Sequence, residues 1–217
     1  RRGPAMHIEP GVLAAAKIAV ADTAVLVLVL AAAWHLRRRP ASWGRTLLAA
    51  LFFTLCMQAF HLKVGPSELH FIGAMPMYLA FGLVPTLLGF ALGLLLQGVL
   101  FEPADLMHWS VNTLSLALPL LAVHSALGRG LERVTLVAVL RFDAAYYAGV
   151  TVMVGFWLSM GQLATPAAEW LRFALSYAAV VALEPLVTTT LLLGVARARR
   201  HRWAAWCFEA RAAVAPR

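Results

Sequence analysis

The sequence predicts an all-α integral membrane protein, a bundle of about seven transmembrane helices forming a single membrane domain over residues 1–217. Hydrophobic residues make up 62% of the 217 positions and charged residues only 13%, against about 45–50% and about 25% in soluble domains. The mean hydropathy is +0.79, and apolar runs close to the length of a bilayer span, about 20 residues, follow one another. Helices are expected in these runs because lipid offers no hydrogen-bond partners to the backbone.

Seven apolar segments are candidates for membrane spans. They are residues 12–34, 46–60, 71–83, 85–101, 109–127, 144–160 and 170–196. The first ends near Pro40, and the fourth starts with Pro85, which a helix start tolerates well. The third is short and contains Pro76, so a half-span buried against its neighbours is an alternative. In the fourth, Gly89 and Gly93 form a Gly-x-x-x-Gly pair, which indicates close packing, more often within a bundle than between molecules.

Basic residues are distributed unevenly among the connections. The connections after the first, fifth and seventh segments carry thirteen of them: Arg37, Arg38, Arg39, Arg45, Arg129, Arg133, Arg141, Arg197, Arg199, Arg200, Arg202, Arg211 and Arg217. The other side has Lys63 together with Arg1 and Arg2. Because basic connections favour the cytoplasm, the N-terminus is predicted outside and the C-terminus inside. The domain then comprises an extracytoplasmic segment 1–11, a transmembrane bundle 12–196 and a basic cytoplasmic tail 197–217.

Several classes of function are not expected for this chain. The net charge of +8 is not organised as a basic face with interleaved aromatic residues, so no nucleic-acid partner is predicted. Cys56 and Cys207 lack a paired ligand spacing, which predicts neither a disulfide nor a zinc or iron–sulfur site. The sequence holds no phosphate-binding Gly-x-x-x-x-Gly-Lys-Ser/Thr motif and no hydrolase motif. We therefore expect no enzyme here, with any ATP hydrolysis on another polypeptide.

Two histidines are predicted to lie at the outer face, because His7 precedes the first span and His70 precedes the third. A histidine in second position behind a free amine chelates strongly, since the amine, the histidine amide and the imidazole Nδ1 form fused rings around one ion. A further imidazole completes a square plane of nitrogens, which suits Ni(II) or Cu(II). Met6 supplies the amine only if it is the true N-terminus, because residues 1–5 precede it. Alternatively, His7 is an ordinary surface residue.

Other polar residues leave alternatives open. His61 is either a further imidazole at this face or an interfacial histidine. Glu184 lies in mid-span, where ionisable side chains are costly and commonly functional, and we expect it to face the bundle interior in a structural or conformational role. A rival function is a b-type haem redox protein, since His108 and His124 bracket the fifth segment and His61 and His70 are close in sequence. A third possibility is a metal-independent scaffold subunit.

Six short segments are similar, in order, to the CbiM/NikM family. They are residues 6–13, 16–18, 65–70, 94–101, 111–113 and 183–188. The opening Met6-His7-Ile8-Glu9-Pro10-Gly11 resembles the start of that family, and Gly65-Pro66-Ser67-Glu68-Leu69-His70 resembles its glycine- and serine-containing histidine segment. The later segments resemble its leucine-rich helix, its asparagine segment and the acidic motif of its last span. The likeness touches most of the chain, and the opening octet is its most specific part.

The family consists of substrate-capture (S) components of energy-coupling-factor (ECF) ABC transporters for cobalt and nickel. The resemblance implies Co(II) or Ni(II) as a transported substrate, no resident cofactor, and a multi-pass location in the bacterial cytoplasmic (inner) membrane. It implies a membrane coupling subunit and cytoplasmic ATPase subunits as partners. It assigns metal ligation to Met6, His7 and His70. Ser67 and Asn112 would orient these ligands through hydrogen bonds.

Overall fold

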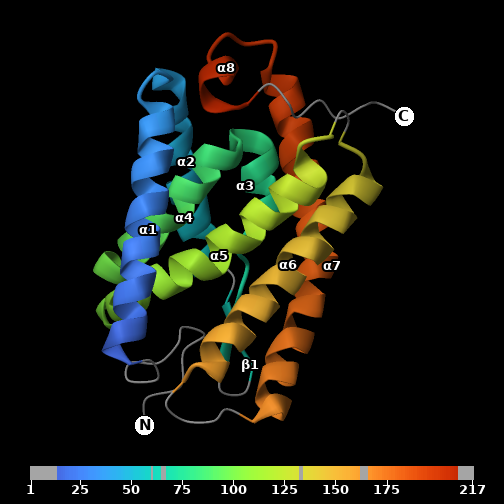
Figure 1. Cartoon of the computed structure of the whole chain (residues 1–217). Coiled ribbons are helices and arrows are strands. Elements are labelled where there is room, and N and C mark those ends of the chain that lie inside the picture. Colours follow the sequence, from blue (N-terminus) through green and yellow to red (C-terminus); the bar gives the residue numbers. More distant parts are fainter. Residues whose placement is uncertain (1–13, 60, 65–66, 132–133, 162–165, 210–217) are drawn as a thin grey trace.

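A computed structural model describes residues 14–59, 61–64, 67–131, 134–161 and 166–209, and it shows a bundle of helices (Figure 1). The elements are α1 Ala15–Leu36, α2 Pro40–Ala59, β1 His61–Val64, β2 Ser67–His70, α3 Ala74–Phe81, α4 Leu83–Leu100, η1 Pro103–His108, α5 Trp109–Val123, η2 His124–Gly128, α6 Leu136–Ser159, α7 Ala167–Ala198 and α8 Ala204–Cys207. The 3₁₀ helix η1 leads into α5, and η2 continues α5 as a π-helical turn. The described chain is helical apart from one hairpin, which confirms the predicted fold class.

Five helical stretches among the described residues are long and apolar enough to cross a membrane. They are Ala15–Leu36, Leu83–Leu100, Pro103–Gly128, Leu136–Ser159 and Trp170–Ala198. α2 has 20 residues and a more polar composition, whereas α3 has only 8 residues. At 1.5 Å per residue α3 rises about 12 Å, well short of the bilayer's hydrocarbon core of about 30 Å. The predicted third span is therefore not one helix.

The third passage along the bundle combines a strand with a short helix. Laid end to end, β2, residues 71–73 and α3 would reach at most about 35 Å, which is close to the thickness of a bilayer. In Figure 1 the hairpin lies in the lower part of the bundle and α3 above it, next to α8. All eight residues of α3 are buried, as are His70 and Ile72. Residues 70–73 are buried or half-buried within the chain, and non-helical backbone is tolerated in a membrane protein where protein rather than lipid surrounds it.

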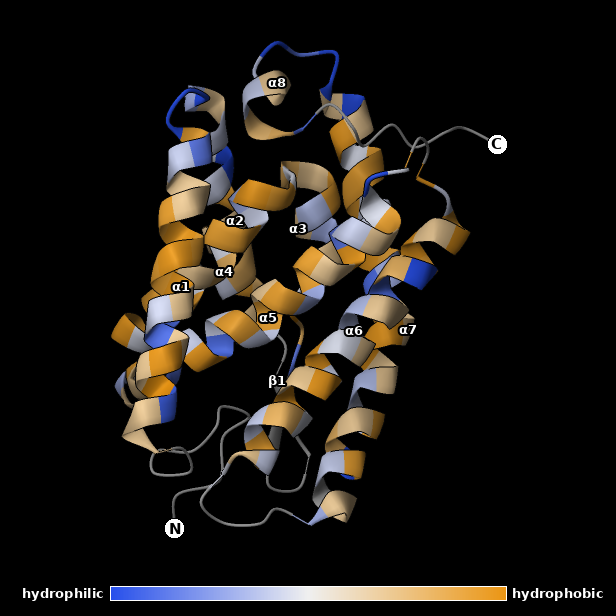
Figure 2. Ribbon diagram, in the orientation of Figure 1, coloured by the Kyte–Doolittle hydropathy of each residue, from blue (hydrophilic) through white to orange (hydrophobic). Residues whose placement is uncertain are grey.

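The two ends of the bundle differ in charge. At the top of Figures 1 and 2, the α1–α2 turn, the end of η2 and the segment after α7 carry exposed basic residues, among them Arg37, Arg39, Arg129, Arg199 and Arg202. We call this the arginine end. The opposite, hairpin end holds the start of α1, the β1–β2 hairpin, the end of α6 and the start of α7 (Figure 1). The basic connections thus gather at one end, as the sequence predicts.

Two helices begin earlier than the apolar pattern predicts. α2 starts at Pro40 instead of residue 46, so Arg45 lies on the helix. α6 starts at Leu136 instead of residue 144, because the Thr135 hydroxyl accepts a hydrogen bond from the Ala138 N–H at 3.1 Å and caps the helix. Arg141 and Asp143 consequently belong to α6 rather than to a connection. In α2 the polar residues Ser42 and Arg45 precede the apolar run, and in α6 Arg141 and Asp143 interrupt it, so both helix starts lie outside a pattern based on apolar residues.

Two glycines allow close helix packing inside the bundle, and large apolar side chains cover its outside. A Cβ at Gly89 would lie 2.7 Å from the Ala49 Cβ, and one at Gly93 would lie 2.5 Å from the Phe53 Cδ1. The Gly-x-x-x-Gly pair therefore lets α4 approach α2 within the chain. Outward-facing leucines such as Leu55 and Leu186 are exposed by 67% and 65%. Apolar residues of this kind line much of the ribbon in Figure 2, as lipid contact requires.

Candidate metal centre

His70 ends the second strand of a short antiparallel hairpin. β1 and β2 pair in a register that sets His61 opposite His70 and Val64 opposite Ser67. The sequence predicted these residues in an outer loop; the chain instead forms a ribbon whose last residue, His70, is only 4% exposed. The backbone register therefore brings the positions of three predicted site residues, His61, Ser67 and His70, together at the hairpin end.

The His70 ring is oriented by the backbone of α2. Its Nδ1 lies 3.1 Å from the Met57 carbonyl oxygen, and because a carbonyl can only accept, Nδ1 is the donor in this hydrogen bond. In the neutral ring the lone pair then belongs to Nε2, the atom that can coordinate a metal. A backbone carbonyl on the second ring nitrogen is the usual partner of a metal-binding histidine. The local geometry of His70 is thus suited to ligation.

Asn112 lies in the same neighbourhood. It is half-buried on α5 and lines a small cavity of about 50 Å³ together with Met57, Ile72 and Tyr177. Met57 is the residue whose carbonyl holds His70, and Ile72 lies two residues after it. The structure therefore brings Asn112 near the His70 segment.

The described residues supply His70 but not a complete donor set. Among them, no group of three or more histidine, cysteine, aspartate or glutamate side chains is arranged to hold a metal ion. Met6 and His7 lie outside the described residues, and His61 and Ser67 are placed by backbone register alone. Of the three predicted ligands Met6, His7 and His70, the described residues contain His70, whose imidazole is buried.

Glu184 faces the interior of the bundle, as predicted. It is fully buried on α7, and its Oε1 accepts a hydrogen bond of 2.9 Å from the Met75 N–H at the start of α3. Its Oε2 accepts from the Tyr147 hydroxyl on α6. The carboxylate thus connects three helices. These hydrogen bonds explain how an ionisable side chain is accommodated inside the bundle.

Asp143 and Tyr147 were not singled out by the sequence. They lie four residues apart on α6, on the face toward Glu184, and the Tyr147 ring packs 5.0 Å from that of Tyr177 on α7. Asp143 is fully buried, and both its carboxyl oxygens lack a hydrogen-bond partner among the described residues. The sequence pattern that could have identified these residues is an aspartate followed four residues later by a tyrosine within an apolar segment. It was missed because the sixth span was started at residue 144.

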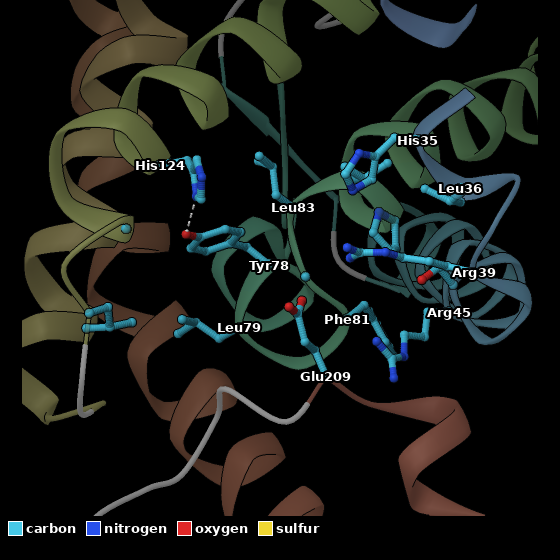
Figure 3. A pocket seen from close by; sticks show the side chains of 16 residues that line it. His35, Leu36, Arg39, Arg45, Tyr78, Leu79, Phe81, Leu83, His124 and Glu209 are labelled. Carbon is cyan, nitrogen blue, oxygen red and sulfur yellow. Dashed lines mark hydrogen bonds between the residues drawn. The ribbon is translucent and has the colours of Figure 1, made fainter. Parts of the chain in front are cut away.

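A cavity with a partly polar wall lies at the arginine end (Figure 3). Its volume is about 290 Å³, and Arg39, Arg45, His35, His124 and Glu209 contribute polar groups to its wall. In Figure 3 the dashed line joins His124 and Tyr78, whose hydroxyl lies 2.7 Å from Nδ1. Two guanidinium groups make this a poor environment for a divalent cation, despite the two imidazoles.

His108 and His124 lie at opposite ends of α5. His108 is buried at its start, whereas His124 follows its last residue. α5 has 15 residues and spans about 22 Å, so these two imidazoles do not reach one haem iron. The pair that suggested a haem protein is thus divided between the two ends of the bundle.

The lipid-facing helices and the enclosed polar groups define a multi-pass integral membrane protein. Within that class, the family model "CbiM: Cobalt uptake substrate-specific transmembrane region" matches residues 7–202. Since the match covers most of the chain, this protein belongs to the CbiM family and is a membrane component of cobalt uptake, which confirms the resemblance seen in the sequence. Comparison with curated proteins and with solved structures gives no match.

Proposed function

We propose that this protein is the substrate-capture subunit of an ECF-type ABC transporter and that it binds Co(II) or Ni(II) at the hairpin end. The observation that carries the proposal is His70, which is buried at that end with its Nδ1 fixed on a backbone carbonyl. Membership of a cobalt uptake family supplies the class of substrate. The metal ion is the cargo, and the proposal needs no resident cofactor.

The hairpin end faces the outside in this proposal. Basic connections favour the cytoplasmic side, and the arginine-bearing connections gather at the other end (Figure 2). The hairpin would then receive the ion from outside the cytoplasmic membrane of a bacterium. The arginine end would face partners in and beneath the membrane. These are a membrane coupling subunit and cytoplasmic ATPase subunits, which supply the energy because the sequence carries no phosphate-binding motif.

The proposed ligands are nitrogen atoms from two distant segments. His70 contributes an imidazole, and His7 contributes its amide nitrogen and imidazole. The Met6 amine joins them where Met6 is the N-terminus. Ser67 and Asn112 support these ligands through hydrogen bonds, with His61 as a further imidazole opposite His70 in the hairpin. An all-nitrogen planar set favours Ni(II) on coordination chemistry alone, whereas the family favours cobalt.

Metal titration of the purified protein tests this proposal. Two forms, one beginning at Met6 and one retaining residues 1–5, would be titrated with Co(II) and with Ni(II), and elemental analysis would give the stoichiometry. We expect the form beginning at Met6 to bind more tightly, because only it offers a free amine behind His7. His70→Ala should weaken binding at least about 100-fold, since it removes a ligand rather than a ligand's support.

His124→Ala is the matched control, because His124 lies at the arginine end and should leave metal affinity unchanged. Wild-type affinity in His70→Ala would overturn the proposed site. A Soret band in the purified protein would favour the haem alternative, and the absence of any metal above background would favour a scaffold subunit.

A further inference from the structure

The start of α3 poses a hydrogen-bonding problem next to His70. The first N–H groups of any helix lack partners within the helix, and they are commonly satisfied by a side chain at the N-cap. Here the N-cap is Gly73, which has no side chain to offer. α3 is buried throughout, so water cannot take that place at low cost. An acceptor must therefore come from another element.

Glu184 supplies that acceptor from a helix 109 residues further along the chain. Its Oε1 accepts from the Met75 N–H at 2.9 Å, and the Ala74 N–H contributes a second backbone donor. A carboxylate at a helix N-terminus is favoured in addition by the helix dipole. Glu184 thus acts as the cap of α3 in place of a residue on α3 itself.

The carboxylate is fixed from its second oxygen as well. The Tyr147 hydroxyl on α6 donates to Oε2, and the Tyr147 ring is itself packed against Tyr177 on α7. With donors on both oxygens, Glu184 has little freedom to rotate away from α3. This arrangement ties the start of α3 to α6 and α7.

The segment between this cap and His70 is short and closely enclosed. Only residues 71 and 72 separate His70 from Gly73, so the chain between them spans at most about 11 Å. Gly73 has a φ of +65°, and a Cβ there would lie 2.8 Å from the Phe52 Cε1 and 3.3 Å from the Cys56 Sγ. His70 is held on its other side by the Met57 carbonyl. A displacement of the start of α3 would therefore displace His70.

We propose that Glu184 is a positioning residue for metal capture, which holds the start of α3 and thereby places the His70 imidazole. This inference rests on the proposed function, in which His70 is a ligand. It also implies the reverse coupling: an ion held by His70 fixes the start of α3, and through Glu184 it restrains α7, which runs on to the arginine end (Figure 1).

Two substitutions at Glu184 distinguish the loss of its hydrogen-bond acceptors from a change in the size of its side chain. Glu184→Met keeps the length of the side chain but removes both acceptor oxygens, whereas Glu184→Gln retains one acceptor for the Met75 N–H. With Co(II) as the probe, we expect Glu184→Met to bind about tenfold more weakly, with an altered visible absorption spectrum. Glu184→Gln should restore most of the affinity. The control is Thr188→Val, one turn further along α7 and equally buried, which should bind like the wild type.

Wild-type Co(II) affinity and spectrum in folded Glu184→Met would overturn the inference. If Glu184→Met does not fold, Glu184→Gln decides: the inference expects an affinity below that of the wild type, and it is wrong if the affinity is unchanged.

Hydrogen exchange of the metal-free protein distinguishes this inference from the proposed function. Loss of the cap should speed exchange of the amides at Ala74 and Met75 in Glu184→Met, whether or not any metal binds. Unchanged exchange there would show that Glu184 does not hold α3. If exchange rises but His70→Ala binds Co(II) like the wild type, the metal site is elsewhere and the proposed function fails instead.

Discussion

The two ends of α3 are built from similar parts but are supported differently. Each end has a glycine with positive φ, +65° at Gly73 and +93° at Gly82, and these are the only positive-φ residues in the described chain. Each glycine also lies near a glutamate from a distant segment: Glu184 serves the end that follows His70, and Glu209 lies against Gly82 at the arginine end.

The two glutamates take part in different hydrogen bonds. Glu184 acts through its side chain, with both carboxylate oxygens bonded and the residue fully buried. Glu209 is attached through its backbone: its N–H donates to the Ala80 carbonyl at 2.7 Å, and its carbonyl accepts from Arg199 at 3.1 Å. Its side chain points into the cavity of about 290 Å³ (Figure 3).

This comparison indicates that the chain concentrates its rigidity at the end of α3 that follows His70. The start of α3 is enclosed by Phe52, Cys56 and Glu184, whereas its end borders open volume and a tail segment. A capture site needs fixed ligands, because small displacements of a ligand reduce metal affinity. In the proposed function the arginine end holds no metal ligand and would contact partner subunits.

Gly73→Ala should have the largest effect on this comparison. The left-handed backbone costs an alanine about 1–2 kcal/mol, and the contact with the Phe52 ring adds a similar penalty. We expect the free energy of unfolding to fall by about 3 kcal/mol, measured by thermal unfolding in detergent, and Co(II) affinity to fall with it.

Gly194→Ala on α7 is the control, because no atom lies within 4 Å of the position a Cβ would occupy. Alanine is the better helix former, so this variant should be neutral or stabilised by up to about 1 kcal/mol. Equal effects at the two glycines would contradict the view that the start of α3 is tightly enclosed.

The apolar pattern predicted the bundle and its two ends, but not how the chain passes along it the third time. The length of the runs and the position of the arginines were sufficient for the first result. Residues 71–83 look like one short span, yet Gly73 divides them, and the helical part begins only where Glu184 caps it. That cap comes from a segment 109 residues away, and no local pattern encodes such a contact.

The candidate site was predictable in part for the same reason. The sequence identified His70 and expected an interior role for Glu184, because a histidine beside a span and an acid within one are unusual. It did not identify Met57, whose contribution is a backbone carbonyl, or Tyr147, which is an ordinary aromatic residue on an apolar helix. The contributions of Met6 and His7 stay predictions, since they lie outside the described residues.

Tyr147→Phe should have an intermediate effect and sharpens the comparison between the two ends. It removes a hydroxyl that donates to a buried carboxylate, and hydrogen bonds to charged groups contribute about 1.5–3 kcal/mol. We expect the free energy of unfolding to fall by about 2 kcal/mol, with a smaller loss of Co(II) affinity than in Glu184→Met, because the Met75 contact is kept.

Tyr78→Phe is the matching change at the other end, since it removes the hydroxyl that lies 2.7 Å from the His124 Nδ1. A loss of about 1 kcal/mol is expected there, with unchanged Co(II) affinity. If Tyr78→Phe lowers Co(II) affinity more than Tyr147→Phe does, the end of α3 that follows His70 is not the one that controls metal binding.

Glu209→Ala should have the smallest effect on Co(II) affinity, although it removes a carboxylate that lies against the positive-φ Gly82. The hydrogen bonds that anchor this segment to Ala80 and Arg199 use backbone atoms, and alanine retains both. Co(II) affinity should be unchanged, because Glu209 lies at the end of α3 away from His70, and the free energy of unfolding should fall by less than in Tyr147→Phe. Thermal unfolding and Co(II) titration of the variant measure both quantities. A destabilisation comparable to that of Glu184→Met would mean that a glutamate side chain secures the Gly82 end of α3 as strongly as the Gly73 end.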